Sequence, residues 1–403
     1  MTYDVAAVRA HFPALEEGAA HFDGPGGTQA PRVVGEAMAR TLTSAVANRG
    51  SITRAERRAE ETVAQCRSAL ADLLGADPRG VVIGRSMTDL TYDFARTLAK
   101  TWQPGDEIVV TRLDHDANVR PWVQAAEAVG ALPRFADFDP TTGELAPDDI
   151  AAHLSPRTRL VAVTAAGNLI GTMPDIPAIT ALVRQRTDAR IYVDGVHYTA
   201  HESVDLPASG ADFWACSPYK FLGPHCGVVA ADPTLLESLQ PDKLLPSTNE
   251  VPERFELGTL PYELMAGVTA AIDFHADLAG LHIGTGTRRE RLIAAYAAIH
   301  QHERRLRELL EPTLRDLPGV QVYSNAQRRT PTLLFTVDGW DSQQVRGALA
   351  ERGINAPAGN FYAIECSRHL GLGDAGGVRV GLAPYTSEDD IVRLLDALRD
   401  LLV

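Results

Sequence analysis

Short apolar runs rich in β-branched residues alternate with helical patterns through the first two thirds of the chain. These runs cover residues 107–111, 132–138, 159–164, 190–194, 211–217 and 227–231. Such alternation is typical of strands buried on both faces of a mainly parallel sheet. The pattern therefore predicts a large α/β domain, whose ligands bind at the carboxyl ends of the strands.

The hydrophobic pattern changes beyond about residue 265, where two long helical segments cover residues 266–281 and 288–314. The elements that follow are strand-like at 320–324 and 332–337 and helical at 342–353 and 388–403. This order predicts a smaller α+β domain. We expect a large domain at residues 20–265 and a small one at 266–403, with residues 1–19 packing against the small domain.

The composition favours a globular protein that acts on a small molecule. The chain has 403 residues, 45% of them hydrophobic, and a formal net charge of -14. Nucleic acid and anionic membranes would repel such a surface on average. The sequence has no secretory signal and no apolar run of about 18 residues. Its four cysteines form no CxxC pair, which predicts reduced thiols in a cytoplasmic protein without a zinc site.

An acid and a lysine follow two of the predicted strands. Asp194 ends the run at 190–194, and Lys220 comes just after the run at 211–217, so both groups belong at the same edge of the sheet. Taken singly, each would be an ordinary surface residue. Together they are what an aldehyde cofactor with a pyridine ring needs, because the lysine forms an imine and the carboxylate keeps the ring nitrogen protonated.

The segment around this lysine, SPYKFLGPHCG, resembles that of the class V aminotransferases, which bind pyridoxal 5′-phosphate (PLP), and in particular their cysteine desulfurase-like branch. From FDGPGGTQAP near residue 22 to VRVGLAPY near residue 378, the segments follow the order of that family. The resemblance implies the fold type I of PLP-dependent transferases, with a large, mainly parallel sheet domain and a smaller C-terminal α+β domain.

The resemblance also implies roles for residues near the cofactor ring. Asp194 matches the aspartate that pairs with the ring nitrogen, and Lys220 matches the lysine that forms the imine. His115, in TRLDHDANVRPW, matches a histidine that stacks on the ring and can move protons. Asn118 follows in the usual order and is expected to contact the substrate.

By resemblance, two further polar residues are expected near the ring hydroxyl or the substrate. Asn168, in TAAGNLIGT, resembles an asparagine that contacts the ring hydroxyl or the substrate. His197, three residues after Asp194, takes a place near the same oxygen that glutamine or histidine often holds. Considered alone, each would more often be a hydrogen-bonded core residue.

A phosphate site is predicted where GRSMTDL follows the strand-like VVI. Ser86, Met87 and Thr88 open a helix there, and free backbone N–H groups with a hydroxyl suit an anion. By resemblance, Thr88 and Ser217 contact the phosphate. The position before the lysine is commonly histidine in the desulfurases and is Tyr219 here, so one phosphate contact is altered or lost.

The resemblance implies two further binding residues. Thr259, in FELGTLPYE, matches a threonine that reaches the phosphate of the neighbouring subunit, so a homodimer is expected. Arg379, in GGVRVGLAPY, matches the arginine that holds the substrate carboxylate, a task suited to a planar, two-pronged cation.

One departure from the desulfurases concerns the cysteine that accepts sulfur from the substrate. The corresponding loop reads Gly359, Asn360, Phe361, Tyr362 and has no cysteine. Cys366 lies a few residues on, in an apparent helix, where a single cysteine is more often a buried apolar residue than a nucleophile.

These features favour a lyase that removes the Cα proton of L-cysteine or an S-substituted cysteine and then eliminates the thiol from Cβ. The shared parts leave cysteine desulfuration, transamination, epimerisation and decarboxylation open, because all of these begin with the same imine. A non-catalytic binding protein fits least, since it has no evident use for both Asp194 and Lys220.

Overall fold

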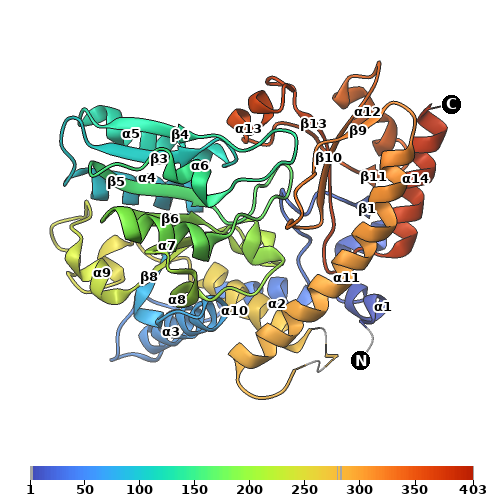
Figure 1. Cartoon of the computed structure of the whole chain (residues 1–403). Coiled ribbons are helices and arrows are strands. Elements are labelled where there is room, and N and C mark those ends of the chain that lie inside the picture. The colour runs from blue at the N-terminus through green and yellow to red at the C-terminus, as the bar shows by residue number, and fades with distance from the viewer. Residues whose placement is uncertain (1–2, 279, 282–283, 403) are drawn as a thin grey trace.

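A seven-stranded sheet forms the centre of the larger part of the molecule (Figure 1). The computed structural model describes residues 3–278, 280–281 and 284–402. In spatial order, the strands of this sheet are β2 (Val81–Gly84), β8 (Gly227–Ala231), β7 (Phe213–Cys216), β6 (Arg190–Asp194), β5 (Thr158–Thr164), β3 (Glu107–Thr111) and β4 (Leu132–Ala136).

Only β8 runs against the other strands, since it pairs antiparallel with both β7 and β2. Strand β2 therefore points in the same direction as β7, and their carboxyl ends meet at one edge. The register places Thr164, Asp194 and Ala215 side by side at the ends of β5, β6 and β7. The expected mainly parallel sheet is confirmed.

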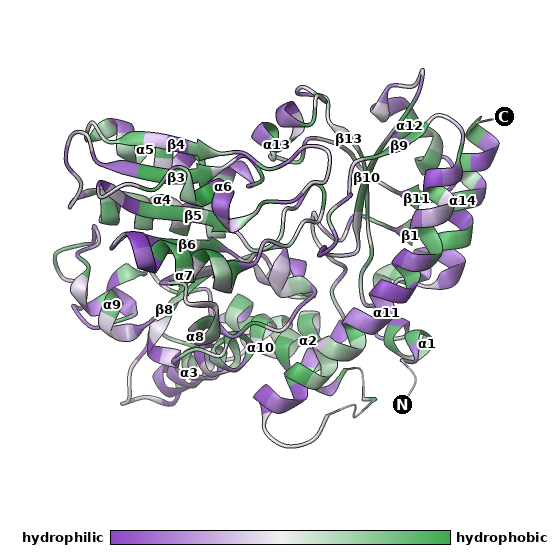
Figure 2. Cartoon of the chain, in the orientation of Figure 1, coloured by the Kyte–Doolittle hydropathy of each residue, from purple (hydrophilic) through white to green (hydrophobic). Residues whose placement is uncertain are grey.

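Helices cover both faces of this sheet because successive side chains of a strand point to opposite sides. On β6, Ile191 and Val193 pack in the cluster of α3, α7 and α10, whereas Tyr192 packs with α4 and α5. Figure 2 shows these strands as mostly hydrophobic. The helices of this part are α2 (Arg32–Leu42), α3 (Arg54–Leu74), α4 (Met87–Ala99), α5 (Arg120–Ala128), α6 (Pro147–Ala151), α7 (Ile176–Arg186), α8 (Leu206–Ser209), α9 (Pro233–Ser238) and α10 (Tyr262–Asp277).

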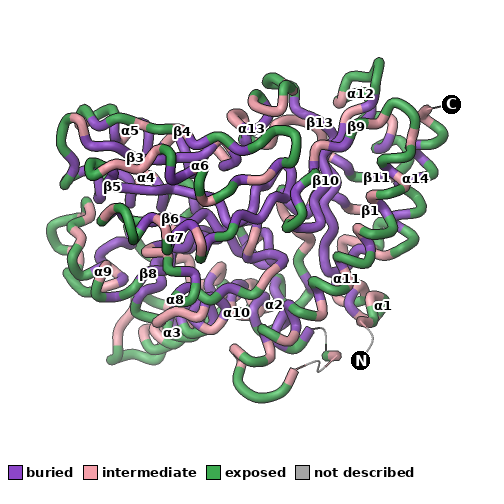
Figure 3. Tube along the Cα trace, viewed as in Figure 1, coloured by how far each residue is buried: buried purple, intermediate pink, exposed green. Residues whose placement is uncertain are grey.

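A second, four-stranded antiparallel sheet belongs to the C-terminal part of the chain, and its strands are largely buried (Figure 3). Its order is β12 (Ala358–Gly359), β13 (Gly377–Gly381), β10 (Thr332–Val337) and β9 (Val320–Val322). The helices here are α11 (Arg288–Asp316), α12 (Ser342–Ala350), α13 (Ile364–His369) and α14 (Glu388–Leu402). Helix α11 contacts both α10 and α14, so it joins the two parts.

Short elements complete the fold. A parallel pair joins β1 (Ala20–His21) to β11 (Ile354–Asn355). The first helix is α1 (Val5–Arg9), and the 3-10 helices are η1 (Pro13–Glu17), η2 (Pro78–Gly80), η3 (Asp116–Asn118), η4 (Tyr198–Ala200), η5 (Pro218–Lys220) and η6 (Glu253–Phe255). No helix among the described residues is both long and apolar enough to cross a membrane.

The N-terminal segment lies against the C-terminal part. The Tyr3 hydroxyl donates to the carbonyl of Pro384 at 2.6 Å, and Arg9 pairs with Asp390 at 2.8 Å. Helix α10, which contacts α2 and α3, spans the expected division between residues 265 and 266. That division stays a prediction.

The expected strands and helices are present, with differences at their ends. Strand β7 stops at Cys216 because Ser217 caps η5. The helix expected at 266–281 begins earlier and ends at Asp277, and part of that expectation, at residue 279, lies outside the described residues. The final helix is described to Leu402, and residue 403 of its expected range lies outside them.

Candidate active site

Strands β2, β3, β5, β6 and β7 end at one edge of the central sheet, and polar residues stand at or just beyond each end. Because these strands share a direction, their carboxyl ends deliver those residues to one place. A cavity of about 70 Å³ lies there. The predicted site residues that line it are Ser86, Met87, Thr88, His115, Asn168, Asp194, His197, Ser217 and Lys220.

The amine of Lys220 is buried at the end of η5. Its Nζ donates to the backbone carbonyl of Pro25 at 2.6 Å. Burial lowers the pKa of Lys220 to about 8, with a further contribution from the charge of Arg379, while Asp194 opposes the shift. An amine with this pKa is partly unprotonated near neutral pH, which is the form that attacks a carbonyl carbon.

The carboxyl group of Asp194 is also buried, and one of its oxygens accepts a hydrogen bond from the backbone N–H of Val196 at 2.9 Å. Burial raises the pKa of Asp194 to about 6, although that hydrogen bond and Lys220 act in the opposite direction. A cationic N–H donor placed against this carboxyl group would favour its ionised form.

The imidazole of His115 caps η3. Its Nδ1 accepts from the backbone N–H of Ala117 at 3.0 Å, so Nε2 carries the proton of the neutral ring. Burial lowers the pKa of His115 to about 3, helped by the charges of Lys220 and Arg379. His115 is therefore a neutral ring with one N–H at the mouth of the cavity, and it stacks on Tyr362 with 5.6 Å between ring centroids.

Two buried polar atoms at the cavity lack a partner among the described residues. His197 uses Nε2 with the hydroxyls of Thr330 and Thr332, at 2.9 and 3.0 Å, and its Nδ1 has none. Asn168 donates from Nδ2 to the carbonyl of Phe361, and its Oδ1 has none. Buried polar atoms are almost always paired, so these two atoms favour a polar ligand at this place.

Helix α4 begins at the cavity. The Ser86 hydroxyl accepts from the N–H of Asp89 at 3.0 Å, and the N–H groups of Met87 and Thr88 precede the first intrahelical bond. At Gly227, where β8 begins, a Cβ atom would lie 2.1 Å from the carbonyl carbon of Ser86, so only glycine allows this approach. The helix N-terminus is thereby held at the sheet edge, where it favours an anion.

A larger cavity of about 640 Å³ adjoins the first and shares Thr88, His115, Asn168 and Lys220 with it. Arg379 of β13 lines it and donates to the carbonyl of Asn168 at 2.9 Å. Its guanidinium lies 3.7 Å from the centre of the Phe361 ring, and its Nε has no hydrogen-bond partner among the residues that the structure describes. Burial lowers the pKa of Arg379 to about 9.

The arrangement agrees with a comparison of the sequence with known families, in which the model described as aminotransferase class-V matches residues 20–394. The chain belongs to the class V aminotransferases. The expected family and fold type are confirmed, and this class V protein is a PLP-dependent enzyme.

Several known proteins are similar to this class V enzyme over its whole length. It is 33% identical to "uncharacterized protein MT3887" of Mycobacterium tuberculosis, over 100% of both chains. It is 32% identical to a probable cysteine desulfurase of Mycolicibacterium paratuberculosis, covering 98% of this chain and 58% of that protein. The crystal structure of the cysteine desulfurase CsdA (S-sulfonic acid) from Escherichia coli is similar with a TM-score of 0.86 and 26% identity, covering 100% of both chains.

The side chains at the sheet edge fit PLP chemically. The partly unprotonated Lys220 suits an aldehyde, and a pyridinium N–H would favour the ionised form of the buried Asp194. The free N–H groups at the start of α4 suit a phosphate. The unpaired atoms of His197 and Asn168 suit a ring oxygen.

The expectation that Asn118 contacts the substrate is contradicted. Asn118 is fully buried, its Nδ2 donates to Asp114 at 2.7 Å, and its Oδ1 accepts from Trp122 Nε1 at 3.0 Å. Both halves of the amide are used inside the fold. Asn118 instead holds Asp114, the residue next to His115.

Of the remaining residues, Thr259 and Cys366 do not line either cavity, whereas Tyr219 does. Thr259 is exposed, next to Gly258, and its contact with a neighbouring subunit stays a prediction. Cys366 lies in α13 as expected and is fully buried. Tyr219 lines both cavities and stacks on His225, with 4.7 Å between ring centroids.

The sequence did not indicate some residues of the larger cavity. Pro25 acts through its backbone carbonyl, which no side-chain pattern reveals. Arg120 lines the cavity from the start of α5 and had no local signal. Tyr92 lies four residues after Thr88 in α4, and this spacing placed it on the same helix face.

Proposed function

We propose that the protein is a PLP-dependent lyase that cleaves the C–S bond of L-cysteine or an S-substituted cysteine by β-elimination. The observation that carries this proposal is the contrast between a site equipped to move protons and cysteines that are all buried. The four cysteines of the sequence lie within the described residues, and all four are buried and free of disulfides.

Burial makes each thiol a poor sulfur acceptor. It raises the pKa of Cys226 to about 12, and it raises the pKa of Cys66, Cys216 and Cys366 as well. A thiol accepts sulfur as its thiolate, which these environments disfavour. The loop at the cavity mouth, residues 359–362, presents Phe361 and Tyr362 instead of a thiol.

We assign the cofactor contacts as follows. Lys220 would form the imine, Asp194 would pair with the ring nitrogen, and His115 would lie on the ring face. Two groups of residues would hold the rest of the cofactor. The phosphate would be held by Ser86, Met87, Thr88 and Ser217, and the ring oxygen would meet His197 and Asn168. The free N–H groups of α4 and the two unpaired buried atoms support these assignments.

Bound PLP supplies an electron sink for the negative charge that develops at Cα. Arg379 holds the substrate carboxylate, and Lys220 takes the proton from Cα as a general base. The Cβ–S bond then breaks, and the proton that Lys220 took from Cα passes to the departing sulfur. His115 is neutral and keeps its proton, so its Nε2–H stabilises the departing thiolate by donating a hydrogen bond. After hydrolysis, the products are a thiol, pyruvate and ammonia.

The size of the larger cavity supports a substituent on sulfur. PLP would fill the part of this cavity of about 640 Å³ that Thr88, His115, Asn168 and Lys220 line, and the remaining part extends beyond these residues. Tyr92, Pro121 and Tyr362 offer apolar and aromatic surface, and Arg120 adds a cation that already pairs with Asp116 at 2.8 Å. We therefore expect S-conjugates to be better substrates than cysteine itself.

Product analysis tests the proposal. The PLP-loaded protein is incubated with L-cysteine and with S-alkyl and S-aryl cysteines, and all products are identified by mass spectrometry. A lyase gives pyruvate, ammonia and the free thiol in equal amounts. Alanine together with a protein-bound persulfide would contradict the proposal.

Cysteine desulfuration is the second candidate, because the similar proteins of known name include cysteine desulfurases. It predicts a persulfide that disappears in Cys366→Ala. A transaminase would pass through the pyridoxamine form and need a keto acid, and an epimerase would exchange the Cα hydrogen with solvent. Each outcome is distinct in the same product analysis.

We further propose a cytoplasmic homodimer in which Thr259 completes the phosphate site of the neighbouring subunit. The exposure of Thr259 and of Leu257, 61% exposed, supports a surface that another chain covers. PLP should then stabilise the dimer by mass action. Sedimentation that finds a fully active, PLP-saturated monomer would contradict this.

A further inference from the structure

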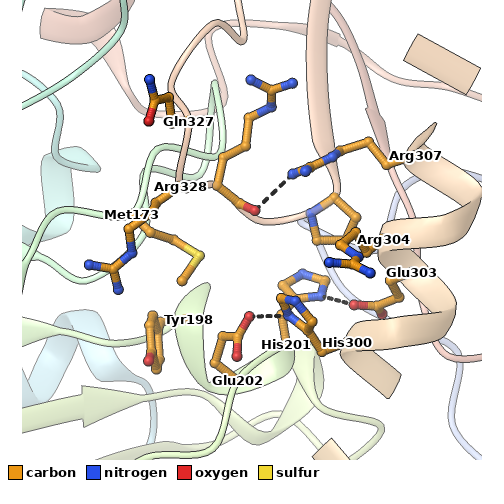
Figure 4. Close-up of a pocket in the computed structure, with 12 residues that line it drawn as sticks. Met173, Tyr198, His201, Glu202, His300, Glu303, Arg304, Arg307, Gln327 and Arg328 are labelled. Atoms are coloured by element: carbon orange, nitrogen blue, oxygen red, sulfur yellow. Dashed lines mark hydrogen bonds and ion pairs between the residues drawn. The ribbon is translucent and has the colours of Figure 1, made fainter. Parts of the chain in front are cut away.

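A third cavity, of about 320 Å³, lies behind the active site, between α11 and the loop at residues 327–331 (Figure 4). Four residues of α11, at spacings of three and four, line it with one helix face: His300, Glu303, Arg304 and Arg307. The end of η4 contributes His201 and Glu202. Figure 4 shows Arg304 and Arg307 on the α11 side and Met173 and Arg328 opposite.

The lining of this cavity gathers arginines in a protein with a net charge of -14. Its two carboxylates are already engaged, since His201 Nδ1 lies 2.8 Å from Glu303 and His300 Nδ1 lies 2.5 Å from Glu202. These pairs occupy the floor of the cavity (Figure 4). Each of these acids contacts a histidine rather than an arginine of the cavity.

Three arginines have only distant ion-pair partners among the residues that the structure describes. Arg304 lies 3.6 Å from Glu308, Arg328 lies 3.8 Å from Asp175, and Arg307 lies 3.9 Å from Glu311. Glu311 also pairs more closely with Arg315 and Arg329. These guanidiniums carry more N–H donors than their carboxylates can accept.

Arg307 is the most enclosed of the three. Its side chain is 17% exposed, and Nη1 donates to the carbonyls of Arg329 and Thr330 at 3.0 and 3.5 Å. Burial and the neighbouring charge of Arg329 lower the pKa of Arg307. A group whose cationic form is disfavoured in this way gains from an added anion.

The cavity shares a wall with the active site. The ring of His201 meets the ring of His197 edge to face, with 5.0 Å between centroids. His197 lines the active-site cavity and contacts Thr330, which directly follows Arg329. A ligand that contacts His201 and Arg307 would therefore reach His197 by two routes. One runs through the ring of His201, and the other runs through Arg307 and Thr330.

We propose that this cavity is a binding site for a small oxyanion, a carboxylate or a phosphate, held by Arg307 with Arg304 and Arg328, and that its occupancy alters the active site through His201 and His197. A two-pronged guanidinium suits both kinds of anion. The site goes beyond the proposed lyase reaction and does not depend on which reaction follows imine formation.

Calorimetric titration of the PLP-loaded protein with inorganic phosphate and, separately, with malonate tests the binding. We expect one site per chain for at least one of the two anions. Arg307→Gln should weaken binding at least about tenfold, because it removes a charge-assisted contact. Arg304→Gln, whose side chain is 57% exposed, should fold normally and weaken binding roughly threefold.

Two variants serve as controls. Arg305→Gln removes a charge from the same helix, at a side chain that is 65% exposed and pairs with Glu388, and should leave binding unchanged. Arg379→Gln removes the arginine of the active site and should leave the Arg307-dependent site unchanged, even if it abolishes a separate anion site in the active site. Binding that is lost in Arg379→Gln but kept in Arg307→Gln and Arg304→Gln would overturn the proposal. So would the lack of saturable binding of either anion up to about 10 mM.

Coupling to the active site has its own readout. The bound anion should change the cofactor absorption band or kcat/KM in the wild type, and should have no such effect in Arg307→Gln. An anion that binds at Arg307 yet changes neither quantity would overturn the coupling through His201 and His197.

Discussion

Two walls of the active site are built in different ways. The wall at the edge of the central sheet consists of residues at or shortly after strand ends, such as Asp194, the last residue of β6, and Ser217, which directly follows β7. The opposite wall comes from the C-terminal part, where Arg379 lies within β13 and Phe361 and Tyr362 lie in a loop. In the proposed reaction, the first wall supplies the base Lys220 and the second holds the groups that meet the substrate.

The two walls also differ in how their backbone is held. Asp194 lies in register with Thr164 and Ala215, so neighbouring strands fix it on both sides. Phe361 and Tyr362 both have positive φ, 52° and 60°, which few residues other than glycine adopt. A rigid sheet suits chemistry that needs exact placement, and a loop can change its side chains without disturbing that sheet.

Lys220→Ala should have the largest effect, because it removes both the imine and the general base. We expect turnover to fall at least about a thousandfold, while some PLP is retained through its phosphate contacts. Borohydride reduction of the wild type should fix the cofactor to the peptide that contains Lys220. Labelling of another lysine would disprove the assignment, and Lys100→Ala, on the surface, is the matched control.

His115→Ala should lower kcat by about a hundredfold and change KM much less, since its hydrogen bond to the departing sulfur strengthens in the transition state. Steady-state kinetics with an S-substituted cysteine measures this. A variant with normal kcat and raised KM would limit His115 to binding. His153→Ala, outside the cavity, should leave both constants unchanged.

The rate at which apo protein binds PLP should rise with pH. Lys220 has a pKa of about 8 and attacks as the neutral amine, so the rate should rise about tenfold per pH unit below that value and level off above it. Stopped-flow absorption of the imine band measures the rate. A rate that keeps rising towards pH 10 would mean that the site does not lower this pKa.

Arg379→Gln tests the opposite wall. Loss of a charge-assisted, two-pronged contact to the substrate carboxylate should lower kcat/KM at least about tenfold, chiefly through KM. Cofactor content and folding are checked in parallel. Arg368→Gln, which removes an exposed arginine from α13, should retain full activity. An unaffected KM in Arg379→Gln would mean that the substrate carboxylate binds to another residue.

Cys366→Ala should have the smallest effect. Removal of a buried thiol should cost about 1 kcal/mol in the free energy of unfolding and leave turnover unchanged. Denaturant unfolding and the product analysis measure the two quantities. A folded but inactive variant, with a persulfide trapped on the wild type, would contradict the lyase proposal and show that the enzyme is a cysteine desulfurase.

The same contrast explains which residues could be predicted from the sequence. Asp194 and Lys220 stand next to apolar runs, so the strand pattern alone placed them at one edge of the sheet. Arg379 lies inside a buried strand and was found only through the family resemblance. Asn118 was misassigned because its position in the motif did not reveal that Asp114 and Trp122 occupy its amide.

Other contacts depend on segments that are far apart in the chain. Lys220 donates to the carbonyl of Pro25, 195 residues away, and Asn168 donates to that of Phe361, 193 residues away. His201 and Glu303, which pair in the cavity beside α11, are 102 residues apart. No local pattern encodes such pairs, because the tertiary fold alone brings them together.

The antiparallel strand β8 also sets the order of events during protein synthesis. Strand β2, which precedes α4, joins the sheet only by pairing with β8. Val81 therefore cannot take its place in the sheet before its partner Ala230 has been synthesised. The start of α4 and Lys220 therefore reach the sheet edge in the same folding step, after residue 231 has left the ribosome. A nascent chain that stops before β8 therefore lacks one side of the proposed cofactor site.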